Sequence, residues 1–461
     1  MIRRQSLRSV NDAKAHPQGP CDSPGFSREG MLYHAGRTVE PATTPPEMKR
    51  KGSAVGKHDQ LLVLGNGFDL QCGLKSAFTD FMKPRDQLME KASLTWDVDS
   101  ASLRKSPDEP YGELSDEDGS ALVLKKMGLT AWDYILKEDE QERTWYDVEE
   151  CIRTWVDYGT GTMVTPCSKH MQHIRSMRYP NWPGIETTAE RAVYFFARDV
   201  YLTGKEGDPA SILSVLLEEL HRFEEIFADY LRKQQENNIW YAVKAAKLLN
   251  TLAADRVHLN QRESTQNIPC EELDGEDTAL NFNYTQPIPT SSDIPSDMLN
   301  VHGLAENHNI IFGMDGKDLG LGQPYYTSTV KFTKTYRLMA LSSRPHQTLV
   351  HPYVAGFPSS ATGVIKFFGH SLGDADYSYF QAIFDEVNLY ESDTHLVFYY
   401  NKNRSNETVQ GKDVKEEMFE KVNRLITAYG TTLDNEDHGR NLLHKLLLEG
   451  RLTIKQAPIE R

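Results

Sequence analysis

The chain has 461 residues, of which 39% are hydrophobic, enough to bury one large core or two moderate ones. Its formal net charge is −15, although residues 1–57 are basic, with ten Lys and Arg against five Asp and Glu. The rest of the chain is acidic and lacks the clustered Lys and Arg of a large nucleic-acid-binding surface, which argues against a nucleic-acid partner.

The five cysteines are widely spaced and form no CxxC pair, so they indicate a reducing compartment rather than a disulfide framework. Cys167, His170 and His173 follow one another at intervals of three, which walks around a helix, so no metal site is expected. The sequence has neither an apolar run of the roughly 18 residues that a membrane span needs nor an apolar signal core. These features predict a cytoplasmic protein without a membrane anchor.

Residues 1–57 mix Pro, Gly, Ser and charge without periodicity, which predicts a disordered leader. The first strand is expected at residues 61–64. Residues 97–274 are predicted to form an acidic loop followed by an inserted helical subdomain. The clearest helix there begins at Asp208 and Pro209, a favourable N-cap and first-turn pair.

Short apolar runs that end at Asn, Gly or His predict the remaining strands, at residues 278–282, 299–301, 310–312, 364–368 and 395–400. Such runs suit parallel strands that are buried on both faces and carry functional loops at their carboxyl ends. The predicted fold class is therefore α/β: a Rossmann-like, mostly parallel sheet flanked by helices, formed by residues 58–96 and 275–405. Residues 406–461 are expected to add two C-terminal helices, at 416–428 and 441–448.

The first strand runs into a glycine turn made of Gly65, Asn66, Gly67, Phe68 and Asp69. Such a turn brings bare N–H groups to the carboxyl edge of the sheet, where open α/β proteins bind nucleotides. The third glycine of the dinucleotide fingerprint is missing. Asp69 would bond a ribose hydroxyl or cap the next helix, and the pattern alone leaves open whether the turn binds a ligand.

Two further predicted strand ends carry polar side chains. Asn281 and Asn283 lie two residues apart and so share a face, where Asn283 either serves a site or caps the strand. His302 ends the following strand, and Gly303 after it admits a close backbone approach. A lone histidine is more often structural, but this one shares its predicted edge with Asn283.

The strand at 364–368 is followed by Gly369, His370, Ser371, Asp374 and Asp376. As a ligand loop, this segment would present N–H groups to a phosphate and a carboxylate to a ribose. The alternative is an ordinary acidic turn in which Asp374 or Asp376 caps a helix.

Glu149 lies on the apolar face of a predicted helix, the face shared by Trp145, Ile152 and Val156. A carboxylate there is costly unless it is paired or faces a polar cleft, which makes Glu149 a candidate site residue. A salt bridge across the subdomain contact is the alternative.

Taken in order, these motifs resemble the bacteriophage abortive infection AbiH family over roughly residues 60–400. The matching segments are LGNGFDL at 64–70, FTDF at 78–81, the helix from Trp145 to Glu149, NFNYT at 281–285, VHG at 301–303, IIFG at 310–313 and GHSLGDAD at 369–376. The resemblance implies a role in defence against phage.

That family is in turn remotely similar to the sirtuin-like domains of antiphage systems, whose glycine turn, strand-end Asn, His-Gly pair and late glycine-acid loop surround NAD. This similarity implies that Asn283 orients the ribose or the attacking water and that His302 is the catalytic histidine, with Glu149 as a third candidate. The residues implied to bind NAD are Gly65, Asn66, Gly67, Phe68, Asp69, Tyr284, Gly303, Gly369, His370, Ser371, Asp374 and Asp376.

Three functions follow as hypotheses. The first is an effector that hydrolyses the nicotinamide–ribose bond of NAD, with His302 as general base and Asp69 or Glu149 stabilising the charged ribose. The second is a non-catalytic sensor of a nucleotide or nucleotide sugar. The third is a nuclease that holds Mg²⁺ through Asp69, Asp374 and Asp376. A phage trigger and self-association into a homo-oligomer are partners that the sequence leaves open.

Overall fold

A computed structural model describes residues 60–102, 124–137, 145–160, 189, 192, 193, 196, 209–255, 277–287, 297–316, 319–323, 325–339, 349–357, 361–401, 413–433 and 436–459. For residues 93–102, 145–147, 158–160 and 209–211 it describes the backbone only. The chain divides into two units, Met1–Ala54 and Val55–Arg461, and every described residue belongs to the second. The predicted leader and the Cys167, His170 and His173 spacing lie outside the described residues.

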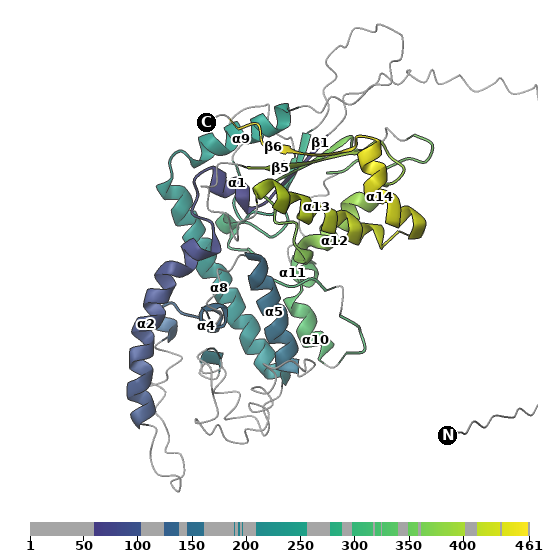
Figure 1. Cartoon of the computed structure of the whole chain (residues 1–461). Helices are drawn as coiled ribbons and strands as arrows, with labels where there is room; N and C mark the ends of the chain where they lie inside the picture. Colours follow the sequence, from purple (N-terminus) through teal and green to yellow (C-terminus); the bar gives the residue numbers. More distant parts are fainter. Residues whose placement is uncertain are drawn as a thin grey trace, which may run out of the picture. The chain divides into compact units, whose positions relative to one another are not determined.

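A six-stranded parallel sheet is the centre of the described structure, with the strand order β3-β2-β1-β4-β5-β6 (Figure 1). Its strands are β1 (Gln60–Leu64), β2 (Asp277–Asn281), β3 (Asp297–Asn300), β4 (Val364–Phe368), β5 (His395–Tyr400) and β6 (Leu452–Gln456). This confirms the predicted α/β class. The order is that of dinucleotide-binding folds, and it reverses between β1 and β4, where such sheets bind ligands beyond the carboxyl ends of their strands.

The central strand β1 is buried along its whole length because helices cover both faces of the sheet. Leu61 and Val63 pack on one face with α12 (Tyr377–Glu386), α13 (Val414–Gly430) and α14 (Glu436–Leu448). Leu62 and Leu64 pack on the other with α1 (Asn66–Gln71) and α9 (Tyr241–Ala254). Figure 1 shows these two helical layers on opposite sides of the strands.

A second group of helices has its own apolar core, beside the sheet in Figure 1. It contains α2 (Phe78–Ser102), α4 (Ala131–Lys137), α5 (Trp145–Thr160) and α8 (Pro209–Asn237). We call it the helical group. The chain after β3 joins it through η2 (Ala305–Asn307), α10 (Tyr326–Thr329), η3 (Val330–Phe332) and α11 (Lys334–Met339).

Four details differ from the sequence-based expectations. Residues 310–312 form no strand: they pack into the helical group, where the Phe312 N–H donates to the Glu224 carboxylate at 2.6 Å instead of to a ladder. Strand β6 was not predicted, because Leu452–Gln456 mixes polar and apolar residues at the half-buried edge of the sheet. Helix α2 runs into the predicted acidic loop as far as Ser102 and packs in the helical group. Helix α9, expected within the insertion, covers the sheet.

Candidate functional site

The loops that follow β1 and β4 touch each other at the reversal of strand order. The Gly65 N–H donates to Phe368 O at 3.0 Å, and the Gly67 N–H donates to Gly369 O at 2.8 Å. A Cβ atom at Gly67 would lie 2.6 Å from the Gly369 Cα, so the contact admits only glycine. Phe68 packs fully buried beneath the turn. In this conformation the two glycine N–H groups predicted to face a phosphate are bonded to the neighbouring loop.

Asp69 belongs to a separate buried network. Its carboxylate accepts hydrogen bonds from the Thr285 hydroxyl at 2.6 Å and the Tyr241 hydroxyl at 2.7 Å. Burial raises the pKa of Asp69 to about 6, although both hydrogen bonds act to lower it. Asn66 is held by Ser76, whose hydroxyl donates to its side-chain oxygen at 2.6 Å. Both polar residues of the turn therefore bond to protein groups that tie α1 to its surroundings.

Asn283 is also satisfied locally. The Asn283 side-chain amide donates to Asn281 Oδ1 at 2.8 Å. The Asn300 side-chain amide donates to the backbone carbonyl oxygen of Asn283 at 2.8 Å. This bonding is the strand-end cap that the sequence left open as the alternative to a site role.

Five ionisable side chains meet in the interior, and we call them the ionic cluster: Glu149, His302, Lys334, His370 and Asp376. The Lys334 ammonium contacts the Glu149 carboxylate and lies 2.6 Å from Asp376 Oδ1. Asp376 also lies 3.2 Å from His302 Nε2 and 3.3 Å from His370 Nε2. Asp376 is the most exposed member, and its side chain is only 13% exposed.

The cluster joins the sheet to the helical group. His302 follows β3, His370 follows β4, and Asp376 ends η5 (Asp374–Asp376) in the same loop. Glu149 comes from α5 in the helical group, and Lys334 begins α11. Four of the predicted site residues therefore converge, although they come from three distant parts of the sequence.

Lys334 is the member that the sequence analysis missed, because a single lysine in a polar stretch carries no pattern. An indirect signal was the glycine of the IIFG motif. A Cβ at Gly313 would lie 2.7 Å from Phe332 O and 3.1 Å from Lys334 N, so this glycine lets the two segments approach. The Lys334 N–H then donates to Met314 O at 3.1 Å.

The charges in the cluster are unequal, since one ammonium faces two carboxylates. Burial raises the pKa of Glu149 to about 8, with Lys334 opposing the rise and Asp376 adding to it. Burial would also raise the pKa of Asp376, but Lys334 and His302 outweigh it and hold that pKa well below its usual value. Burial and the nearby ammonium lower the pKa of His302 to about 4. At neutral pH the cluster therefore combines an ionised Asp376 with a neutral His302 and a Glu149 that retains its proton.

The two histidines differ in their bonding. His370 Nδ1 accepts from the Leu372 N–H at 2.9 Å, which assigns the ring proton to Nε2, toward Asp376. Leu372 is buried with φ at 56°, a left-handed conformation that costs a non-glycine residue about 1–2 kcal/mol. His302 Nε2 is buried and faces Asp376 Oδ1 at 3.2 Å, although this contact does not meet the geometry of a hydrogen bond. Both imidazoles therefore face the Asp376 carboxylate, but only His370 has its other ring nitrogen fixed by a backbone N–H.

Aromatic rings enclose the histidines. Phe282 lies edge-on to His302 and His370, with ring centroids 5.5 and 4.4 Å apart. The ring centroids of Tyr284 and His302 lie 6.1 Å apart, and Tyr284 also packs against the core of the helical group. Gly303 has φ at 86°, and a Cβ there would meet the Asn309 carbonyl oxygen at 2.1 Å.

Two of the predicted ligand residues, Ser371 and Asp374, are exposed at the surface. The three acids proposed for Mg²⁺ are consequently dispersed, because Asp69 lies in its own buried network and Asp376 is bound by Lys334. Within the described part of the chain, no three His, Cys, Asp or Glu side chains are grouped to hold a metal ion.

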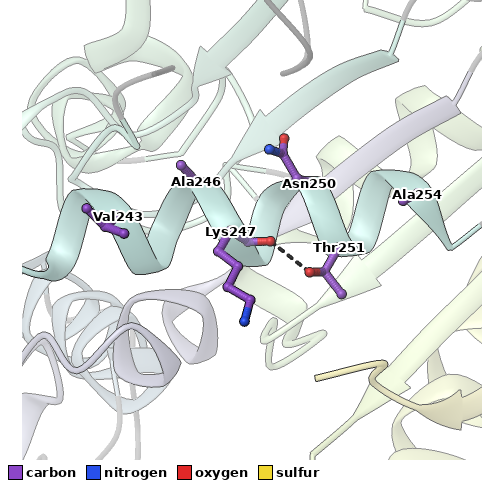
Figure 2. Close-up of a pocket in the computed structure, with 6 residues that line it drawn as sticks. All are labelled: Val243, Ala246, Lys247, Asn250, Thr251 and Ala254. Carbon is purple, nitrogen blue, oxygen red and sulfur yellow. Dashed lines mark hydrogen bonds between the residues drawn. The ribbon is translucent and has the colours of Figure 1, made fainter. Parts of the chain in front are cut away.

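A hollow in the surface lies away from this chemistry. Figure 2 shows that its lining residues all belong to α9: Val243, Ala246, Lys247, Asn250, Thr251 and Ala254. The Thr251 hydroxyl donates to the Lys247 carbonyl at 2.8 Å within the helix. The hollow contains no member of the ionic cluster. We place the candidate site at the ionic cluster, because four of the predicted site residues converge there.

The profile of the family described as bacteriophage abortive infection AbiH matches residues 61–400. The chain belongs to the AbiH family. The match runs from β1 to the end of β5 and includes all five members of the ionic cluster. Membership of the AbiH family indicates a role in abortive infection, a response to bacteriophage. Comparison with curated proteins and with solved structures finds no match. No helix in the described residues is long and apolar enough to cross a bilayer.

Proposed function

We propose that this AbiH protein is an abortive-infection effector that hydrolyses the nicotinamide–ribose bond of NAD at the ionic cluster. The observation that carries the proposal is the convergence of His302, Glu149, Asp376 and Lys334 in one buried cluster, whose environments shift the pKa values of His302 and Glu149 in opposite directions. His302 has its pKa lowered to about 4 and Glu149 has its pKa raised to about 8. Pairs of titratable groups whose environments push their pKa values apart mark acid and base roles.

In this reaction water attacks the ribose C1′ as the bond to the nicotinamide nitrogen breaks. The pyridinium leaves as neutral nicotinamide, so its departure needs no proton. The water proton passes to His302 as the general base, and then to solvent; Asp376, 3.2 Å from His302 Nε2, stabilises the imidazolium that forms. Asp376 offers a negative charge to the oxocarbenium-like ribose, and protonated Glu149 can donate to a ribose hydroxyl. The products are ADP-ribose, nicotinamide and one proton.

The location of the cluster supports a nucleotide as the substrate class. It lies beside the carboxyl ends of β3 and β4 in a sheet with the strand order of dinucleotide-binding folds. The remote similarity to sirtuin-like domains points to the same ligand. Since the Gly65 and Gly67 N–H groups are bonded to the loop after β4, pyrophosphate could bind there only when the two loops separate.

The test is incubation of the purified full chain with NAD, ATP and nucleotide sugars, followed by mass spectrometry of the products. We expect NAD to yield nicotinamide and ADP-ribose. A positioned general base is worth about 10²–10⁴ in rate, so His302→Ala should lose activity on that scale while remaining folded. The matched control is His308→Asn at an exposed histidine with φ at 50°, a conformation that asparagine tolerates.

Three outcomes would overturn the proposal. If NAD stabilises the chain against heat without being cleaved, even with phage lysate added as a trigger, the protein is a sensor. If His302→Ala still protects cells from phage as the unaltered chain does, the cluster is not the effector site. Cleavage of nucleic acid that requires added Mg²⁺ would instead favour a nuclease.

A further inference from the structure

We infer that Lys334 is a positioning residue of the ionic cluster: its ammonium group, held between Glu149 and Asp376, fixes the charge on the two carboxylates. Its importance for catalysis rests on the proposed function. Its role in setting protonation does not, and it can be measured separately.

The surroundings of Lys334 are unusual for a lysine. Lysine side chains normally extend their ammonium group into water. Here Lys334 is 2% exposed, and its Nζ turns inward to contact Glu149 and Asp376. A buried charge is costly unless it is paired and hydrogen-bonded, and two of the three ammonium donors have carboxylate partners.

The backbone holds Lys334 in place independently of its side-chain contacts with Glu149 and Asp376. Its N–H donates to Met314 O, and the Met314 N–H donates to Phe332 O, at 3.1 and 3.0 Å. Gly313 leaves room for this approach, since a Cβ there would lie 3.3 Å from the Lys334 Cγ. One turn further along α11, Arg337 forms a bidentate pair with Glu224. Backbone contacts therefore position Lys334 at the cluster, and its place does not depend on attraction between the ammonium and the two acids.

The charges around Lys334 come from every neighbouring element. Glu149 faces it from α5, Asp376 from η5, and the two histidines from the ends of β3 and β4. Asp315 adds a more distant negative charge, and Arg337 is engaged by Glu224. One ammonium can compensate one carboxylate. Asp376 also faces both imidazoles, so it is the acid that stays ionised, and the remaining proton falls to Glu149.

Removing the ammonium should shift the titration of its neighbours in a defined direction. In Lys334→Met the pKa of Asp376, His302 and Glu149 should all rise, because Lys334 lowers each of them. For the two carboxylates Lys334 is an opposite charge and for the His302 imidazolium a like charge, and a charge at this range shifts a pKa by about 1–3 units. In Lys334→Met, both the acidic and the basic limb of the pH profile of NAD cleavage should move to higher pH by about that amount. Lys334→Arg keeps the charge, so both limbs should stay near their positions in the unaltered chain.

The experiment measures kcat/KM for NAD against pH for the full chain, Lys334→Met and Lys334→Arg. A purely structural role for Lys334 would reduce the rate at every pH and leave both limbs where they are. That result would overturn the inference.

A second measurement, the free energy of unfolding against pH without NAD, needs no turnover. Native Glu149 keeps its proton to about pH 8, whereas the unfolded chain releases it near its ordinary value of 4.5. The native state binds more protons in that window, so stability falls as pH rises through it. Lys334→Met should extend the fall above pH 8, and Glu149→Gln should remove the part of it that lies between about pH 6, the native pKa of Asp69, and pH 8.

The two measurements separate the two proposals. If NAD is not cleaved but Lys334→Met extends the fall, the proposed function is wrong and the inference stands. If NAD is cleaved and neither profile moves, the inference is wrong. Should Lys334→Met fail to fold, Asp376→Asn leaves Lys334 with Glu149 alone, and the fall should then end below pH 8. An end point that does not move would contradict the role assigned to Lys334.

Discussion

Asp69 shows how a buried carboxylate depends on the hydrogen bonds that replace its lost water. Its native pKa of about 6 lies above the ordinary 3.8. Between these two values the native state holds a proton that the unfolded chain has released, so this group makes stability fall as pH rises. The hydroxyls of Thr285 and Tyr241 limit that penalty by bonding the ionised form.

Tyr241→Phe should therefore destabilise the protein in a pH-dependent way. Loss of the hydroxyl raises the pKa of Asp69 further, because that hydrogen bond lowers it. A hydrogen bond to a charged group is worth about 1.5–3 kcal/mol, and we expect a loss of that size at pH 8 and a smaller one at pH 4. Urea unfolding at the two values measures the difference.

Tyr230→Phe is the matched control for that substitution. The Tyr230 hydroxyl donates to the Lys75 carbonyl oxygen at 2.9 Å, which does not titrate. The loss of stability caused by Tyr230→Phe should be the same at pH 4 and pH 8. Equal losses at both pH values for Tyr241→Phe would contradict an ionised, hydrogen-bonded Asp69.

Among the elements, the contact between the loops after β1 and β4 has the tightest steric limits. The Gly67 N–H bonds to Gly369 O, and Gly369 itself has φ at 71°. The glycines that suggested a phosphate cradle thus serve a contact between two backbones in the described conformation.

Gly67→Ala should force the two loops apart, since its Cβ would lie 2.6 Å from a Cα atom that cannot yield. Overpacking of this kind costs typically about 1–3 kcal/mol, which thermal unfolding would detect. Gly322→Ala is the control, because a Cβ there meets nothing within 4 Å. A normal melting temperature for Gly67→Ala would show that the loops are not held together as described.

The comparison of sequence and structure shows which features local pattern can reveal. Strands β1, β4 and β5 were predictable because each is a short, mostly apolar run bounded by turn residues. The run at 310–312 looked the same but packs among helices, a tertiary effect that no local pattern contains. Strand β6 lies at an edge and needs no apolar run, so nothing marked it.

The candidate site was predictable only in part, for a related reason. Glu149 was found because a carboxylate on an apolar helix face violates the pattern around it. His302, His370 and Asp376 were found because they follow recognisable strands. Lys334 violates no local pattern, and only the fold brings it between the two acids.

At the scale of the whole molecule, the sheet and the helical group are joined by buried ions as well as by apolar contacts. The ionic cluster is one junction. A second set of buried charges lies within the helical group: Glu224 of α8 accepts a bidentate pair from Arg337 of α11 and also the Phe312 N–H. Burial raises the pKa of Glu224, and Arg337 opposes the rise.

Arg337→Met should destabilise the helical group by leaving a buried carboxylate without its partner. Breaking a buried pair from one side costs about 3–5 kcal/mol. Without Arg337 the pKa of Glu224 rises further above its ordinary value, so the native state holds a proton that the unfolded chain releases more readily, and the loss of stability grows as pH rises. The loss of stability in urea should accordingly be larger at pH 8 than at pH 5.

The double variant Arg337→Met with Glu224→Gln should recover much of that loss, because glutamine removes the charge and still offers an oxygen to the Phe312 N–H. Hydrogen exchange adds a spatial test. If the ion pair stabilises the helical group, amides of α8 in Arg337→Met should exchange faster while those of β1 keep their protection. Uniform acceleration in both elements would mean that the sheet and the helical group open only together, and that this pair stabilises the molecule as a whole rather than the helical group alone.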